Sequence, residues 1–301
     1  MMTTKFLVTD EQVGPRIDAL VSMYMTDISR TRATELVRNG LVLINGQAKK
    51  AKYKPQVGDE IEIFIPEVAV LEIISQDLNL DIVYEDSSVA IVNKPSGMVV
   101  HPSLGHLNGT LVNGLMHAIK DLSGINGQRR LGIVHRIDKD TSGLLMVAKN
   151  DNAHESLSEQ LKEKTVKREY IALVHGVIDH DLGKIDAPIG RDPKDRIRYE
   201  VVENGKESVT HFEVLQRFAD YTLIKCRLET GRTHQIRVHM RYIGNPLVGD
   251  PLYGLRKTYK SDFGQFLHAK SIGFDHPETG EFLEFEAGMP EEFIAFLNEL
   301  V

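Results

Sequence analysis

Short strand-like runs, interrupted by isolated helices, fill the sequence from about residue 80 onwards. Alternating or continuous apolar residues and flanking turn formers mark "DIVYEDSSVAIVNKP", "KREYIALVHGVI", "SVTHFEVLQRF" and "DYTLIKCRLET". Helices are predicted in "DNAHESLSEQLKEKTV", with Asp151 or Asn152 as cap, and in "GRTHQIRVHMRYIGNP", starting at Thr233. This pattern predicts an α+β domain over 80–301, built on a mixed, largely antiparallel sheet with flanking helices.

The front of the chain follows a different pattern. Residues 15–39 predict two short helices, of which the second is capped by Ser29 and stops at Gly40. Asn45-Gly46 is a hairpin turn signal. The strand that follows places three residues on one face: Ile61, Ile63 and Ile65. We therefore expect a small αα-β domain over 1–66, followed by a linker over 67–79.

Charge is unevenly distributed along the chain. The net charge of −7 argues against a nucleic-acid partner, because phosphate binding favours a positive surface. Between residues 30 and 54, however, Glu35 is the only acid, and the bases are Arg30, Arg32, Arg38, Lys49, Lys50, Lys52 and Lys54. A charge run often marks only a solvated face, but a polyanion responds to local rather than net charge. The first domain is therefore the candidate for contact with a polyanion.

The remaining compositional signals concern location. Cys226 is the only cysteine, which excludes a disulfide framework and disfavours cysteine metal sites. The first residues lack the basic start and apolar core of a signal peptide, and no apolar run approaches membrane-spanning length. We expect a cytoplasmic, monomeric protein without membrane contact.

Three segments carry polar residues inside apolar stretches. They are "NKPSGMVVHPS" around Lys94, "GIVHRIDKDTSGLL" around Asp138 and "LETGRTHQIRVHM" around Arg237. Asp138 is predicted on a tight connection between two strand-like runs, just before a turn at 141–143. Taken singly, each segment is equally well explained by a buried ion pair that serves the fold, such as Asp138 with an arginine. No metal-ligand spacing, phosphate-binding loop or dinucleotide fingerprint accompanies them, so any chemistry is expected to need neither metal nor cofactor.

The front module resembles a known RNA-binding domain. "RIDALV…SRTRATELVRNGLVLINGQAKKAKYKPQVGDEIEI" is similar to the S4 domain along its whole length. In that family the second helix and the following turn present basic side chains to structured RNA. The resemblance therefore implies RNA contact by Arg30, Arg32, Arg38, Lys49 and Lys50.

The rest of the chain, from about Leu80 to Phe285, resembles the RluA/RluD-type pseudouridine synthases. The resemblance is carried by "HRIDKDTSG", "KREYIALVHG" and "TGRTHQIRVH" in that order, with Ile in "HRID" where Leu is commoner. It implies an enzyme that converts uridine in RNA to pseudouridine without cofactor or metal. By resemblance, Asp138 is the nucleophile and Arg237 its paired cation. Tyr170 lies against the target base, and Arg136 enters the base stack when the uridine flips out.

These residue types suit those roles. The isomerisation breaks the C1′–N1 bond, turns the base and rejoins it at C5, which requires a group that attaches transiently. A carboxylate can do so only while ionised, and a nearby cation keeps it ionised. A base within a helix must first be extruded, and an aromatic side chain supports it by stacking.

The RluD-like branch, with an S4 domain at the front, favours 23S ribosomal RNA as the substrate. Two alternatives remain: a synthase that acts on tRNA, and a non-catalytic RNA-binding or ribosome-assembly protein on a synthase scaffold. The intact set of Asp138, Tyr170 and Arg237 favours an enzyme, because a binding module would not need it.

Overall fold

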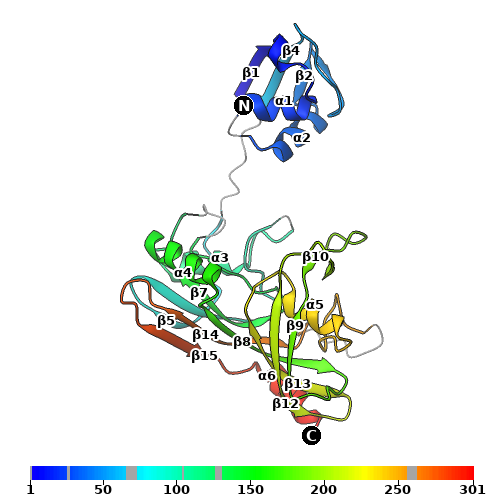
Figure 1. The fold of residues 1–301 in the computed structure, drawn as a ribbon. Coiled ribbons are helices and arrows are strands. Elements are labelled where there is room, and N and C mark those ends of the chain that lie inside the picture. Colours follow the sequence, from blue (N-terminus) through cyan, green and yellow to red (C-terminus); the bar gives the residue numbers. More distant parts are fainter. Residues whose placement is uncertain (1, 26–27, 66–72, 104, 126–130, 256–262) are drawn as a thin grey trace. The chain divides into compact units, whose positions relative to one another are not determined.

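The computed structural model describes residues 2–25, 28–65, 73–103, 105–125, 131–255 and 263–301 (Figure 1). The chain divides into two compact units, Met1–Glu72 and Ile73–Val301. The division falls inside the stretch 67–79 expected to be a linker, of which 67–72 lies outside the described residues. No helix in the described ranges is both long enough and apolar enough to cross a membrane.

The smaller unit packs two helices, α1 (Ile17–Tyr24) and α2 (Arg30–Arg38), against an antiparallel sheet. The sheet order is β1 (Met2–Leu7), β4 (Glu60–Ile65), β2 (Val42–Ile44) and β3 (Gln47–Ala48), and a short 3₁₀ helix, η1 (Asp10–Gln12), follows β1. Strand β1 was not among the elements predicted from the sequence.

Three local predictions for this unit are confirmed. The Ser29 hydroxyl caps α2 by accepting the backbone N–H of Arg32 at 3.3 Å. Asn45 and Gly46 close the β2–β3 hairpin with φ values of 49° and 75°, the left-handed conformation that this turn requires. The inner face of β4 buries Ile61 and Ile63 completely, whereas Ile65, at the end of the strand, is only partly buried.

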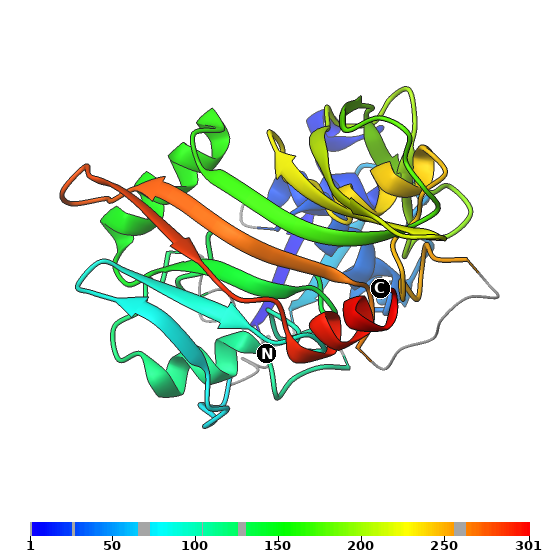
Figure 2. The same ribbon diagram turned by 90° about the horizontal axis from the view of Figure 1, so that it is seen from below.

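The larger unit is built on one long sheet. Its order is β5 (Asp81–Glu85), β6 (Val89–Lys94), β7 (Ser142–Ala148), β14 (Leu267–Asp275), β8 (Lys167–His175), β13 (Tyr221–Leu228), β12 (Val209–Arg217) and β9 (Leu182–Asp186), and β15 (Phe282–Glu286) also pairs with β14. The pairing of β7 with β14 is parallel, and the other pairings described are antiparallel. In Figure 2 the orange strand β14 lies between the green β8 and the cyan β5–β6 hairpin. The predicted α+β class is confirmed.

Helices cover both faces of this sheet. Alternate strand residues point to opposite sides, and both sets are apolar in β6, so each face needs a covering layer. Ala90 and Val92 of β6 pack with α3 (Leu111–Ala118), and Val89 and Ile91 pack with α4 (Asp151–Glu163). Further along, α5 (Gln235–Tyr242) packs beside β12 and the small ribbon of β10 (Ile189–Arg191) and β11 (Tyr199–Val201), and α6 (Glu291–Glu299) covers the opposite face of β8.

Two helix starts differ from prediction. The cap of α4 is Asn150, whose side chain accepts the N–H of Ala153 at 2.9 Å, rather than Asp151 or Asn152. Helix α5 begins at Gln235 rather than Thr233, because His234 adopts a left-handed conformation with φ of 58°. Both predicted helices form, and only their starts are shifted, by one or two residues.

The predicted turn at 141–143 is wrong. Ser142 and Gly143 open β7, and the turn instead spans 138–141, where the N–H of Thr141 donates to the carbonyl of Asp138 at 3.1 Å. The run before Asp138 is not a strand either, and forms only an isolated bridge from Ile133 to Val147. Gly143 serves close packing: a Cβ there would lie 2.2 Å from the carbonyl oxygen of Ala269 on β14.

Candidate active site

Asp138 lies in the loop that precedes β7, and a buried lysine anchors this loop. The Lys94 ammonium, with no exposed surface, donates to the carbonyl oxygens of Pro95, Met98 and Lys139 at 2.8–2.9 Å. Burial lowers the pKa of Lys94 to about 7, although Asp140 and Asp138 oppose the change. Lys94 therefore holds the backbone next to Asp138 in place. The signal for this role in the sequence was only a polar residue in an apolar stretch.

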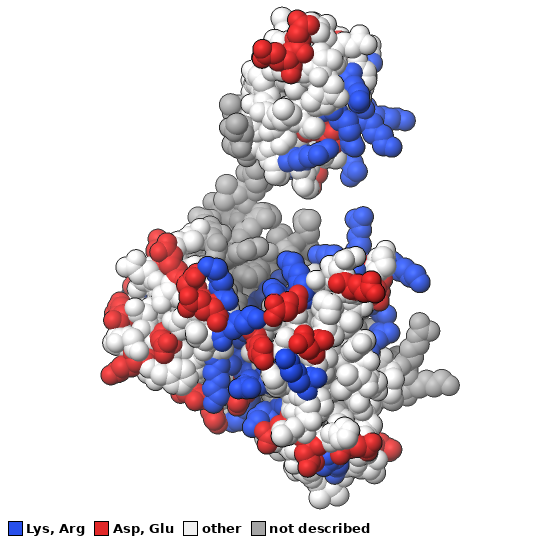
Figure 3. All heavy atoms as spheres, viewed as in Figure 1, with Lys and Arg blue, Asp and Glu red and all other residues white. Residues whose placement is uncertain are grey.

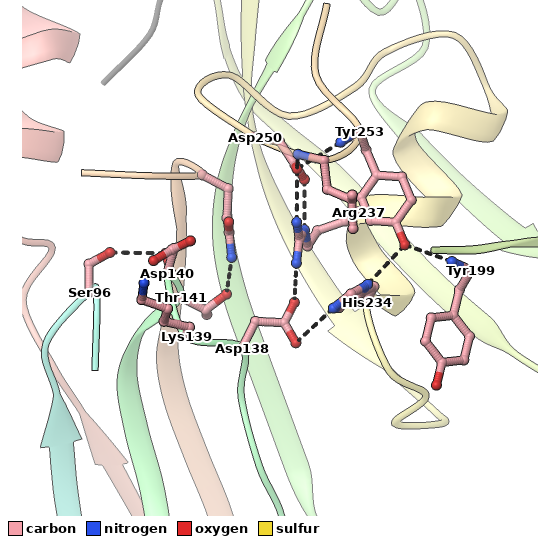
Figure 4. Close-up of polar contacts among 12 residues, drawn as sticks. Ser96, Asp138, Lys139, Asp140, Thr141, Tyr199, His234, Arg237, Asp250 and Tyr253 are labelled. Atoms are coloured by element: carbon pink, nitrogen blue, oxygen red, sulfur yellow. Dashed lines mark hydrogen bonds and ion pairs between the residues drawn. The ribbon is translucent and has the colours of Figure 1, made fainter. Parts of the chain in front are cut away.

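Arg237, in the first turn of α5, joins two carboxylates (Figure 4). Its Nη1 donates to Asp138 Oδ2 at 2.8 Å, and its Nε and Nη2 donate to the two oxygens of Asp250 at 2.7 and 2.8 Å. Burial lowers the pKa of Arg237, but the two aspartates more than offset this and raise it overall. The Asp138–Arg237 contact implied by the resemblance is present, 99 residues apart in sequence.

Asp250 is the buried carboxylate that holds Arg237 in place. Its side chain has no exposed surface, and it also accepts the backbone N–H groups of Leu252 and Tyr253. Burial raises its pKa, but the hydrogen bonds and charge of Arg237 outweigh burial, so the pKa of Asp250 lies below its usual value. A carboxylate that stays charged here fixes the guanidinium, which in turn fixes Asp138.

His234 faces the other oxygen of Asp138, with Nε2 3.8 Å from Oδ1. Burial lowers the pKa of His234, against the opposing charge of Asp138, so the ring is neutral at pH 7. The Tyr253 hydroxyl accepts the N–H of Tyr199 at 2.9 Å and lies 2.8 Å from His234 Nδ1. Burial raises the pKa of Tyr253 to about 12, so this hydroxyl keeps its proton at neutral pH. Tyr253 thereby holds the imidazole of His234 in position beside Asp138.

A cavity of about 380 Å³ opens beside Asp138, and Asp138, Arg136, Tyr170, His234 and Arg237 all contribute to its lining. Tyr170, on β8, is buried, and burial raises the pKa of its hydroxyl. Arg136 is exposed, and the Asp138 side chain is 17% exposed. Across the described ranges, no group of three or more His, Cys, Asp or Glu side chains is placed to bind a metal ion.

The structure thus brings together the four residues that the sequence predicted for this site, Asp138, Tyr170, Arg237 and Arg136. It adds residues that sequence reasoning missed: Asp250, Tyr253 and Arg168. Asp250 had a weak signal in "GDPLYG", where an aspartate before proline is typical of a turn stabilised by its own side chain. Arg168 stands two residues before Tyr170, so it points to the same face of β8.

The five basic residues predicted in the smaller unit are all at least partly accessible. Arg30, Arg38 and Lys50 are exposed; Arg32, which pairs with Glu35 at 3.4 Å, and Lys49 are half-buried. In Figure 3, Lys and Arg side chains of this unit gather on one side of it. Nothing in their contacts conflicts with a role on a polyanion.

Comparisons with known proteins agree with this geometry. The family model described as RNA pseudouridylate synthase matches residues 88–242, and the S4 domain model matches 15–61. An uncharacterised RNA pseudouridine synthase of Bacillus subtilis (strain 168) is 60% identical over 293 residues, which cover 97% of this chain and 96% of that protein.

Two further proteins are similar over most of their length. Ribosomal large subunit pseudouridine synthase D of Neisseria meningitidis serogroup A is 45% identical over 302 residues, 96% of this chain and 80% of that protein. The structure of human RNA pseudouridylate synthase domain containing 1 superposes with a TM-score of 0.57 at 27% identity, over 74% of this chain and 86% of that one. The chain therefore belongs to the RluA-type family of RNA pseudouridine synthases, isomerases of uridine in RNA, and binds RNA through an S4 domain.

Proposed function

We propose that this synthase modifies uridine in 23S ribosomal RNA and that Asp138 is its nucleophile. One observation carries the assignment of Asp138: its carboxylate opens on the cavity while Arg237 holds it from behind at 2.8 Å. A charged oxygen that is oriented yet accessible is what transient attachment to a nucleoside requires.

The neighbouring residues have complementary proposed roles. Arg237 keeps Asp138 ionised and fixes its direction, and Asp250 fixes Arg237. Tyr170 supports the extruded base, which returns about 1–3 kcal/mol of the few kcal/mol that extrusion costs. Arg136, exposed at the cavity, fills the place that the uridine leaves in the stack. The isomerisation breaks the C1′–N1 bond, forms the C1′–C5 bond, releases the C5 proton and protonates N1. Overall the substrate neither gains nor loses atoms or electrons.

Support for the 23S substrate comes from the relatives named ribosomal large subunit pseudouridine synthase D, at about 45% identity to this chain. The test is to map pseudouridines in ribosomal RNA and tRNA from cells with and without this protein. We expect specific positions in 23S RNA to remain uridine in its absence and to be restored by the parent chain. Losses confined to tRNA would replace the proposed substrate and leave the enzyme class unchanged.

A second prediction concerns the basic residues of the S4 domain. Replacing Arg30, Arg38 and Lys50 together by glutamine should weaken binding of the substrate RNA and reduce its salt dependence. Each lost contact to a duplex phosphate lowers the slope of log K against log salt by about 0.9. Lys5→Gln is a matched control, because Lys5 pairs with Glu62 outside the basic cluster. If the triple variant keeps the parental slope, these residues do not bind RNA.

A further inference from the structure

Among the described residues, one buried arginine of the active-site cavity has a side-chain nitrogen without a hydrogen-bond partner. Arg168, on β8, is 7% exposed and lines the cavity, and its Nε is buried without a hydrogen-bond partner. Arg237, which also lines the cavity, instead donates to two aspartates, Asp138 and Asp250. Burying an unpaired cation is unfavourable unless something else supplies the negative charge.

The chain makes room for this guanidinium. A Cβ atom at Gly231 would lie 2.5 Å from Arg168 Nη1. Gly231 is not among the glycines with positive φ, so its backbone conformation does not require glycine. The absent side chain is instead what allows Arg168 to occupy this part of the cavity.

The surroundings of Arg168 call for an anion. Burial, with a contribution from Arg168, lowers the pKa of the adjacent His135 to about 3, so this histidine is neutral. Arg136 and Arg232 add positive charge to the lining, whereas its carboxylate, Asp138, already pairs with Arg237. Uracil is uncharged, so the phosphodiesters are the anionic groups that an RNA substrate brings.

The spacing fits a nucleotide. Arg168 and Tyr170 lie on the same face of β8, and their Cα atoms are about 7 Å apart along the strand. This is the scale that separates the base from the phosphate within one nucleotide. A base stacked on Tyr170 would therefore place a flanking phosphate within reach of Arg168.

We propose that Arg168 binds a phosphodiester that flanks the flipped uridine, in a subsite that Gly231 leaves open. The planar guanidinium can grip two phosphate oxygens at once. The proposal rests on the proposed function, because it takes this cavity as the site of the uridine.

The experiment measures binding of a synthetic stem–loop that contains the uridine identified by the mapping above. Neutral methylphosphonate replaces the phosphate on the 5′ or the 3′ side of that uridine. Each probe carries a 2′-O-methyl group on the preceding ribose and is compared with the same oligonucleotide bearing an ordinary phosphate. The binding assay uses the Asp138→Asn protein, which prevents turnover. It also keeps this test separate from the proposed role of Asp138: if Asp138 is not the nucleophile, the variant retains catalytic activity, whatever the binding of the probes.

At one of the two positions, methylphosphonate should weaken binding about ten- to hundredfold, the loss expected for one charge-assisted contact. The same replacement should have almost no effect once Arg168→Met is added. Arg217→Gln should retain the full effect, because Arg217 pairs with Asp181 outside the cavity. Equal weakening with and without Arg168, at both positions, would overturn the proposal.

A second variant guards against misfolding of Arg168→Met. Gly231→Ala keeps the charge but displaces the guanidinium, and should also reduce the methylphosphonate effect. Circular dichroism and thermal unfolding report whether each variant is folded. If Gly231→Ala is folded and binds the phosphate and methylphosphonate probes as the parent does, the proposed subsite is also wrong.

Discussion

Replacing Asp138 by asparagine should lower turnover by at least about 10⁴-fold, as expected when a nucleophile is removed. Asparagine has almost the same shape, and its amide oxygen can still accept the hydrogen bond of Arg237, but it cannot form the transient bond to the nucleoside. Single-turnover assays of pseudouridine formation in the substrate RNA measure the effect.

The fold and the affinity for RNA should change little in this variant, which thermal unfolding and binding titrations check. Asp140→Asn is the matched control, because Asp140 lies in the same turn but does not line the cavity. We expect near-parental turnover from it. Appreciable product from the Asp138→Asn enzyme would disprove the assignment of the nucleophile.

Replacing Arg237 by methionine should impair both stability and catalysis. The change leaves Asp250, which has no exposed side-chain surface, and the 17% exposed Asp138 without their cation. Removing one partner of a buried ion pair lowers the free energy of unfolding by about 3–5 kcal/mol. For a domain of this size that lowers Tm by about 6–20 °C. An equal loss in the transition state reduces turnover about a hundredfold to several thousandfold.

The stability loss should depend on pH. In the parent, the lowered pKa of Asp250 means that its ion pair stabilises the fold above about pH 4, and this contribution is lost as pH falls through the lowered pKa. Without Arg237, burial raises the pKa of Asp250, so its ionisation above about pH 4 opposes folding. The difference in free energy of unfolding between parent and variant should therefore be largest at neutral pH and shrink toward pH 4.

Arg237→Lys should recover only part of either property. An ammonium cannot donate in parallel to both oxygens of Asp250 while also reaching Asp138. Urea unfolding at several pH values, together with turnover assays, tests both variants. Near-parental turnover of Arg237→Met would mean that Asp138 does not depend on this cation.

The sequence allowed most of the elements to be predicted, because their signals are local. Period-two runs predicted β8, β12 and β13, and Asn45-Gly46 predicted a turn that depends on few neighbours. The wrong turn at 141–143 shows the limit. Gly143 is a glycine because its φ is 108° and because β14 lies against it, and that neighbour is remote in sequence.

The site was predicted only in part for the same reason. The resemblance supplied Asp138, Tyr170, Arg237 and Arg136, but not Asp250, which holds Arg237 from a loop whose signal in the sequence, an aspartate before a proline, is weak. Nor could the sequence reveal that Arg168 is buried and lacks a partner for its Nε, since that depends on how β8 and the segment around Gly231 pack.

The position of β14 also bears on how the protein is made. This strand fills the gap between β7 and β8, and its His268 meets Ser142 across 126 residues of sequence. Until it has been synthesised, β7 and β8 each present an unpaired edge, and pairings between distant segments form slowly. The smaller unit has its own core and comes from the first part of the chain. During synthesis, the RNA-binding unit is therefore expected to fold well before the catalytic unit can be completed.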